Sequence, residues 1–144
     1  MKPFVLSTIA LVLLLSCSEE ALLDNKADRV SGMWVFKEAK YHDYNRVFAN
    51  DLNREYDGDI IELDFDFYAV YTDFELKEAF EGSWGIYLET DEYEDIYFVE
   101  MTFYDPVVEE EFGYYAEIEM VTNNKMNLIA RNTNGEYRFK LLRL

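Results

Sequence analysis

Apolar and polar residues alternate with a period of two along most of this chain from residue 32 onward. In each alternating run one parity is apolar and the other is mostly polar or acidic, as over 61–67, 97–104, 114–121 and 137–141. Successive side chains of a β-strand point to opposite faces of a sheet, so these runs predict strands with one buried face. Residues that favour turns separate the runs, namely Asp57-Gly58, Asp105-Pro106, Asn123-Asn124 and Asn134-Gly135.

The pattern predicts eight strands and no long amphipathic helix after residue 31. Their expected ranges are 33–41, 59–66, 68–74, 79–89, 96–104, 113–122, 125–132 and 136–143. One bent strand over 60–74 is the alternative to the second and third strands, and residues 43–56 form a loop or a short helix. Short connections favour an antiparallel meander, and closing it into a barrel leaves no exposed edge. The predicted fold class is therefore all-β, an antiparallel meander closed into a barrel, with an open sandwich as the alternative.

The same parity predicts which side chains fill the barrel. The expected inward set is rich in aromatic residues: Trp34, Phe65, Phe80, Trp84, Tyr97, Phe103, Tyr114, Tyr137 and Phe139. An eight-stranded barrel is either just filled by its side chains or holds one small ligand. Side chains of this bulk predict a filled or nearly filled interior with both tryptophans buried.

Residues 1–16 have the pattern of a secretory signal peptide, with Lys2 ahead of the apolar run 4–15. This run is shorter than the ~18 residues that a membrane-spanning helix needs. Leu14-Leu15-Ser16-Cys17 resembles the lipobox of bacterial lipoproteins. The resemblance implies that Cys17, the only cysteine, is lipidated (palmitate being one of its acyl chains) and becomes the first residue of the mature protein. A cleaved signal peptide with an incidental cysteine is the alternative.

The residues after Cys17 refine the expected location. Ser18-Glu19-Glu20 resembles the acidic export signal of surface-exposed lipoproteins, although a plain charged linker explains it equally well. We expect a lipid anchor in the outer membrane, on the cell surface or the periplasmic face. Residues 17–31 are predicted to be the lipidated cysteine and a tether with at most one helical turn, and 32–144 the barrel domain.

Two short motifs resemble those of lipocalins. Gly32-Met33-Trp34 resembles the G-x-W signature at the start of the first lipocalin strand, and Gly82-Ser83-Trp84 repeats it. Small bacterial lipocalin-like lipoproteins also end in a strand similar to Tyr137-Arg138-Phe139-Lys140-Leu141. The resemblance implies an eight-stranded antiparallel barrel with a tryptophan closing one end.

The balance of charge bears on partners. Thirty acidic and thirteen basic residues give a formal net charge of −17. Nucleic acids and anionic lipid surfaces would repel such a chain, so we predict no nucleic-acid partner. Cationic proteins remain compatible with this charge.

The residues needed for catalysis are scarce. His42 is the only histidine, so neither a nucleophile–base pair nor a zinc site can be assembled in the usual way. We predict no cofactor, no metal and no enzymatic activity. The predicted function is a membrane-anchored binding or accessory module. The alternatives are a carrier of a small apolar ligand in the lumen, which is not favoured, and an acidic inhibitor of a cationic enzyme.

Outward-facing aromatic residues give a candidate binding surface. Tyr87, Phe98, Tyr104 and Tyr115 fall on the outward parity of three successive predicted strands. Exposed apolar patches often mark partner sites, so these four are predicted to contact a protein partner. Scattered surface tyrosines, or packing against 43–56, explain them as well.

Overall fold

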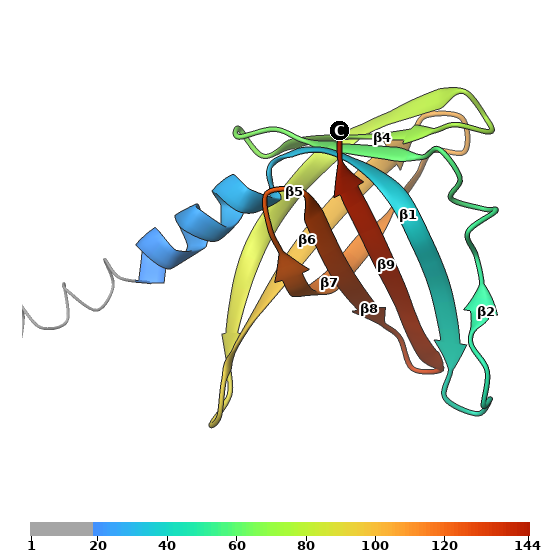
Figure 1. The fold of residues 1–144 in the computed structure, drawn as a ribbon. Helices are drawn as coiled ribbons and strands as arrows, with labels where there is room; N and C mark the ends of the chain where they lie inside the picture. Colours follow the sequence, from blue (N-terminus) through green and yellow to red (C-terminus); the bar gives the residue numbers. More distant parts are fainter. Residues whose placement is uncertain (1–18) are drawn as a thin grey trace, which may run out of the picture.

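The computed structural model describes residues 19–144, which form a helix over 19–30 followed by nine strands (Figure 1). The strands are β1 (Gly32–Asp43), β2 (Asn50–Asp51), β3 (Ile60–Leu63), β4 (Tyr68–Asp73), β5 (Glu78–Thr90), β6 (Asp95–Asp105), β7 (Glu110–Val121), β8 (Lys125–Arg131) and β9 (Gly135–Arg143). All eight predicted strands are present, and 60–74 forms two strands rather than one.

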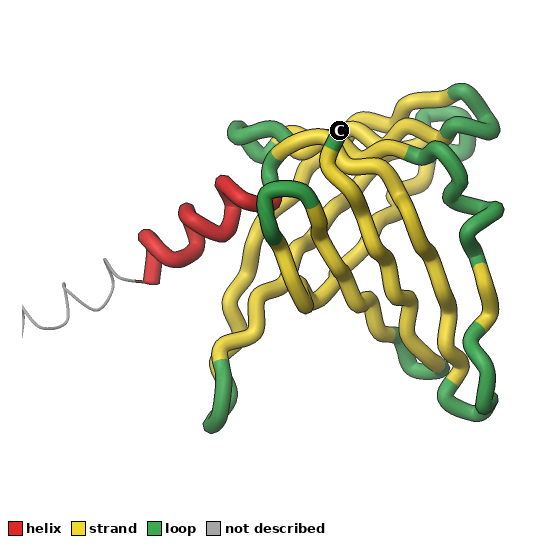
Figure 2. Tube along the Cα trace, viewed as in Figure 1, coloured by secondary structure: helices red, strands yellow, loops and turns green. Residues whose placement is uncertain are grey.

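Eight of the strands close into an antiparallel barrel. The order β1-β3-β4-β5-β6-β7-β8-β9 is sealed by pairing of β1 with β9, from Trp34 opposite Arg143 to Asp43 opposite Gly135. The short β2 lies outside this ring and pairs with Lys40 and Tyr41 of β1. Strands wrap around the lumen and the connections lie at its two ends (Figure 2). The predicted all-β closed barrel is confirmed.

The turn between β3 and β4 differs from the prediction. β3 ends at Leu63, and the N–H of Phe67 donates to the carbonyl oxygen of Asp64 at 3.0 Å to close a turn. The strand alternation stops where the chain reverses, so Phe65 is 75% exposed and Phe67 is about half exposed. The prediction that Phe65 points inward is therefore wrong.

A β-bulge in β7 causes a second difference from the predicted alternation. The register of β7 against β8 shifts between Ile118 and Met120, as happens where a bulge inserts an extra residue. From this point the sides exchange, so Met120 is exposed and Val121 is buried. The alternation over 114–121 therefore predicts the wrong side for these two residues.

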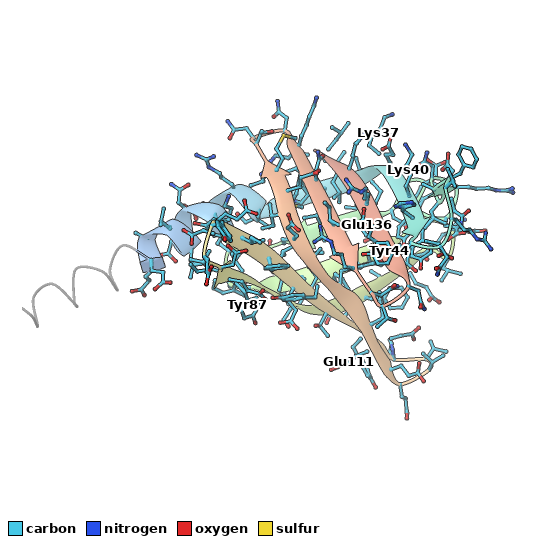
Figure 3. All side chains as sticks on the ribbon, turned by 90° about the horizontal axis from the view of Figure 1, so that it is seen from below. Lys37, Lys40, Tyr44, Tyr87, Glu111 and Glu136 are labelled. Carbon is cyan, nitrogen blue, oxygen red and sulfur yellow. The ribbon has the colours of Figure 1, made fainter. Side chains whose placement is uncertain are left out.

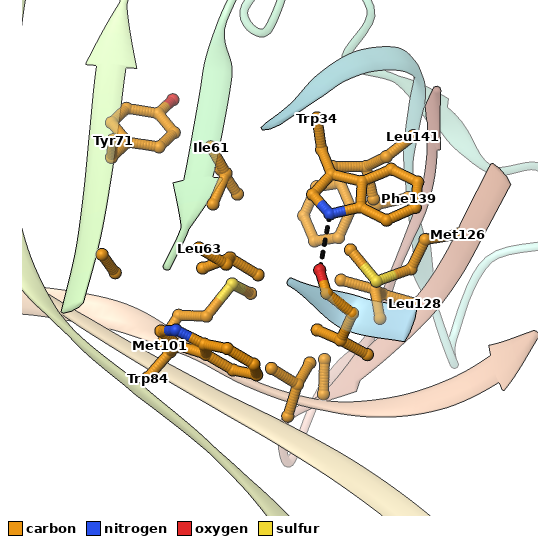
Figure 4. Packing of buried hydrophobic residues seen from close by; sticks show 14 of the residues in the cluster. Trp34, Ile61, Leu63, Tyr71, Trp84, Met101, Met126, Leu128, Phe139 and Leu141 are labelled. Atoms are coloured by element: carbon orange, nitrogen blue, oxygen red, sulfur yellow. Dashed lines mark hydrogen bonds between the residues drawn. The ribbon is translucent and has the colours of Figure 1, made fainter. Parts of the chain in front are cut away.

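Both tryptophans are buried near the end of the barrel where β1 begins (Figure 4). The indole N–H of Trp34 donates to the carbonyl oxygen of Val30 at 2.7 Å, and that of Trp84 donates to the carbonyl oxygen of Asp64 at 2.8 Å. Each ring thus fills the core while its one polar group is satisfied. The predicted burial of Trp34 and Trp84 is confirmed.

The segment expected to be a tether is instead helical. The helix over 19–30 ends at this closed end of the barrel, where Val30 is buried and Ala27 packs against the core. Lys26 lies over the ring of Tyr97, 4.3 Å from its centroid. Ala27 and Val30, three residues apart, form the apolar face that anchors the helix. Two apolar residues in an otherwise polar segment are too few to predict an amphipathic helix from the sequence. Among the described residues, no helix is long and apolar enough to cross a membrane.

Aromatic rings pack against one another across the lumen. Phe36 contacts Phe139 with ring centroids 5.4 Å apart, and Phe80 contacts Phe112 at 5.2 Å. Phe103 lies 5.6 Å from Tyr71. Of the expected inward set, these residues are buried or half-buried in the core cluster: Trp34, Phe80, Trp84, Tyr97, Phe103, Tyr114, Tyr137 and Phe139.

Candidate functional site

Three of the predicted aromatic residues form one cluster on the outside of the barrel. Tyr87 of β5 pairs with Phe98 of β6, and Tyr115 of β7 pairs with Glu100 of β6. The rings of Phe98 and Tyr115 are stacked, with centroids 4.9 Å apart and planes at 5°, and Tyr87 lies 6.3 Å from Tyr115. Tyr87 and Tyr115 are 48% and 46% exposed, and Figure 3 shows Tyr87 on the outer face of the sheet. We call these three residues the aromatic patch.

Carboxylates border the aromatic patch. The hydroxyl of Tyr115 donates to the Glu89 carboxylate at 2.7 Å, and partial desolvation together with this bond raises the pKa of Tyr115 to about 12. A hydrogen bond with the Glu100 carboxylate, and its charge, raise the pKa of Tyr87. Both phenols therefore stay protonated at neutral pH and act as donors to acids. Within residues 19–144, no ion pair involves Glu89 or Glu100.

Two further carboxylates nearby have cationic partners, which they share with Glu136. Glu117 is paired with Arg131, and Glu119 lies 3.7 Å from Arg138. The negative charge free to meet a partner therefore lies at Glu89 and Glu100, next to the exposed rings.

Tyr104 stands apart from the aromatic patch. It is exposed on the same face of β6, where it pairs with Glu111 of β7. Along the described chain no ring contact links it to the other three, because Glu100 and Thr102 separate it from Phe98 on that face. The alternation of the sequence therefore places all four aromatic residues on the outer face, whereas the strand register shows that Tyr104 lies apart from the other three.

A second group of aromatic residues occupies the end of the barrel opposite the helix. Tyr56, from the loop after β2, packs against Phe36 at 4.9 Å, and its hydroxyl lies 3.2 Å from that of Tyr114. Burial is the main cause that raises the pKa of both tyrosines. The sequence analysis did not identify Tyr56; its only signal is one tyrosine in a polar loop.

A buried acid fixes the loop that carries Tyr56. The carboxylate of Asp59 is buried, accepts a hydrogen bond from the Tyr71 hydroxyl, and accepts another from the N–H of Phe74 at 2.9 Å. Burial and this bond to Asp59 raise the pKa of Tyr71 far above its usual range. Both oxygens of the acid are therefore used in holding the loop against β4.

A pocket of about 350 Å³ opens where β7 separates from β8. Pairing of these strands ends at Glu117 opposite Ile129, so the chain from 110 to 116 has β6 on one side and no strand on the other among the described residues. The pocket is lined by Tyr56, Gly113, Tyr114, Tyr115, Ala130, Arg131, Asn132 and Tyr137.

The remaining candidate residues contribute no reactive constellation. His42 lies near the end of β1, with Nε2 3.2 Å from the carbonyl oxygen of Arg46 in an exposed loop. In the part of the chain that the structure describes, no group of three or more His, Cys, Asp or Glu side chains is arranged to hold a metal ion. Cys17 and the signal peptide lie outside the described residues.

Compared with protein-family models, curated proteins and solved structures, this chain matches none. Its function is therefore inferred from the residues of this chain alone.

Proposed function

We propose that this protein is a lipid-anchored, lipocalin-like binding module of the outer membrane that holds a protein partner on the outside of its barrel. It acts without catalysis and without a cofactor. The lipobox-like residues ending at Cys17 support the anchor, and the two G-x-W motifs support the lipocalin resemblance.

The observation that carries the proposal is the aromatic patch. Stacked rings of Phe98 and Tyr115, with Tyr87 beside them, leave apolar surface in water on a three-stranded face. Aromatic side chains stabilise interfaces because they remove a large apolar area from water at small entropic cost. The carboxylates of Glu89 and Glu100, which are hydrogen-bonded to tyrosines but have no cationic partner within the described residues, favour a partner with basic residues around its own apolar contact.

The packed lumen also supports an external site. Rings such as Phe36, Phe103 and Phe139 already occupy the space that an apolar ligand would need. Carriage of a small ligand inside the barrel would require these rings to move.

The test is capture of a partner from native membranes by variants of the patch. The double variant Phe98→Ser and Tyr115→Ser is expected to keep its thermal stability and to lose a protein that the wild type retains. Tyr104→Ser is the matched control, because Tyr104 is equally exposed on the same face and makes no ring contact with the patch.

Retention of the same proteins by the double variant would overturn the proposal. The salt dependence separates the alternative of an acidic inhibitor. If capture depends on the overall charge rather than on the patch, it is lost from the wild type as ionic strength rises, and the double variant behaves identically.

A further inference from the structure

The free edge of β7 is unusual in a closed barrel. Closure normally pairs every strand on both sides, whereas within residues 19–144 the backbone of 110–116 is paired with β6 alone. Figure 3 shows Glu111 on the β6–β7 hairpin, which projects away from the rest of the barrel. Backbone N–H and C=O groups on this edge can pair with another extended chain.

The pocket beside this edge supplies places for side chains. Its floor contains Tyr56, Tyr114 and Tyr137, and its far wall is the end of β8 at Ala130 and Arg131. Because strand side chains alternate, every second residue of a chain added to β7 would point toward these rings. The intervening residues would point outward, beside Glu111 and Tyr115.

The charge of the side chains along this edge indicates what kind of extended chain can bind to it. Glu109, Glu110 and Glu111 follow one another at the start of the free edge, and all are exposed. The cation at the rim, Arg131, is already paired with Glu117 and lies 3.5 Å from Glu136. A second copy would place the same acidic run against this edge, with a net charge of −17 on each full chain, so self-pairing is opposed.

We propose that the edge of β7 over 110–116 binds an extended segment of a partner protein by strand addition, with apolar side chains entering the pocket and lysine or arginine side chains on the outward face, beside Glu111 of the acidic run Glu109–Glu111. Recognition of this kind takes its affinity from main-chain hydrogen bonds and its specificity from alternate side chains. The edge shares Tyr115 with the aromatic patch, but strand addition uses the main chain of 110–116 and does not depend on the function proposed for the patch.

The experiment uses a short capped peptide in which lysine alternates with valine as the probe. Amide hydrogen exchange of the protein is followed with and without this peptide. We expect exchange to slow at residues 110–116, and to slow little elsewhere. A peptide with the same side chains and N-methyl groups on alternate residues is expected to give no protection, because it lacks the donors that face β7.

Charge reversal supplies the matched variants. Glu110→Lys with Glu111→Lys is expected to weaken peptide binding about three- to ten-fold, since favourable pairs between exposed charges are replaced by repulsion that solvent screens. Glu92→Lys with Glu94→Lys makes the same change in net charge at the β5–β6 turn, the other end of β6, and is expected to leave peptide affinity nearly unchanged.

Several results would overturn the proposal. Equal protection by the N-methylated peptide would show electrostatic capture without strand pairing. Protection of 110–116 that grows with protein concentration alone would show self-association. Displacement of the peptide by a small apolar dye, without protection of the β7 amides, would assign the pocket to a small ligand. Phe98→Ser is expected to bind the peptide normally. Failure of the strand-addition proposal can therefore be distinguished from failure of the proposal that the aromatic patch binds a partner.

Discussion

The guanidinium group of Arg143 lies over the indole ring of Trp34, 4.2 Å from the ring centroid. The same group donates to the carbonyl oxygens of Ser31 at 2.7 Å, Arg29 at 2.6 Å and Asn123 at 2.6 Å. One side chain of the last strand therefore joins the first strand, the end of the helix and the β7–β8 turn.

Replacing Arg143 should test this connection. Arg143→Met is expected to lower the free energy of unfolding by about 2–3 kcal/mol, through loss of the cation–π contact and of charged hydrogen bonds. Urea unfolding followed by circular dichroism measures the change. Arg46→Met is the control, because Arg46 is exposed in a loop and its ion pair with Asp43, at 3.8 Å, contributes little. Equal losses in both variants would contradict a special role for Arg143.

Two glycines of β5 should respond differently to alanine. A Cβ atom at Gly82 would overlap the backbone carbonyl of Thr102 on β6, whereas one at Gly85 would lie 3.5 Å from the ring of Tyr87, an ordinary contact. Gly82→Ala is therefore expected to cost about 1–3 kcal/mol through displaced backbone, and Gly85→Ala close to nothing. Thermal unfolding of the two variants side by side checks this difference; tolerance of alanine at Gly82 would contradict it.

The buried pair of Tyr71 and Asp59 predicts loss of stability at alkaline pH. Burial and the bond to Asp59 raise the pKa of Tyr71, so the unfolded chain gives up this proton near its usual pKa of about 10 while the folded protein keeps it. The stabilisation is complete below about pH 10 and is lost as pH rises above it. Tyr71→Phe should lower stability at pH 8 by about 1–3 kcal/mol and make the fall above pH 10 shallower by about 1.4 kcal/mol per pH unit.

Urea unfolding at pH 8, 10 and 11 measures both effects. Tyr104→Phe, an exposed tyrosine with no such partner among the described residues, should leave stability at pH 8 unchanged. An unaltered slope in Tyr71→Phe would mean that other groups govern the alkaline transition.

The proposed lipid anchor is tested at Cys17. Cys17→Ala is expected to abolish incorporation of labelled palmitate and to release the protein from the membrane fraction, since no other cysteine is present. Cys17→Ala protein should keep the circular dichroism spectrum of the barrel. Palmitate incorporation at the wild-type level would rule out the lipoprotein assignment.

Alternation along the chain was sufficient to predict the eight barrel strands, because each keeps one face in the core over several residues. It failed where the backbone leaves the regular strand. Phe65 falls in a turn closed by local hydrogen bonds, and Met120 follows a bulge that exchanges the two faces. Neither event has a marker in the pattern of apolar residues.

For the candidate surfaces too, alternation predicts which face a residue occupies but not which residues are in contact. Parity assigned Tyr87, Phe98 and Tyr115 to one outer face, but only the register shows that their rings touch and that Tyr104 lies apart. The free edge of β7 depends on where pairing with β8 stops, which is set by two strands together. Such a feature has no signature within either strand alone.

The seal between β1 and β9 also governs when this protein can fold. Trp34 meets Arg143 only after nearly the whole chain is available, so closure joins residues that are far apart in sequence. Contacts of this kind slow folding, to about milliseconds to seconds in β-rich domains. A chain in which β9 has not yet been synthesised cannot close the barrel. Such a delay would suit the export proposed above, in which the chain crosses a membrane before the barrel closes.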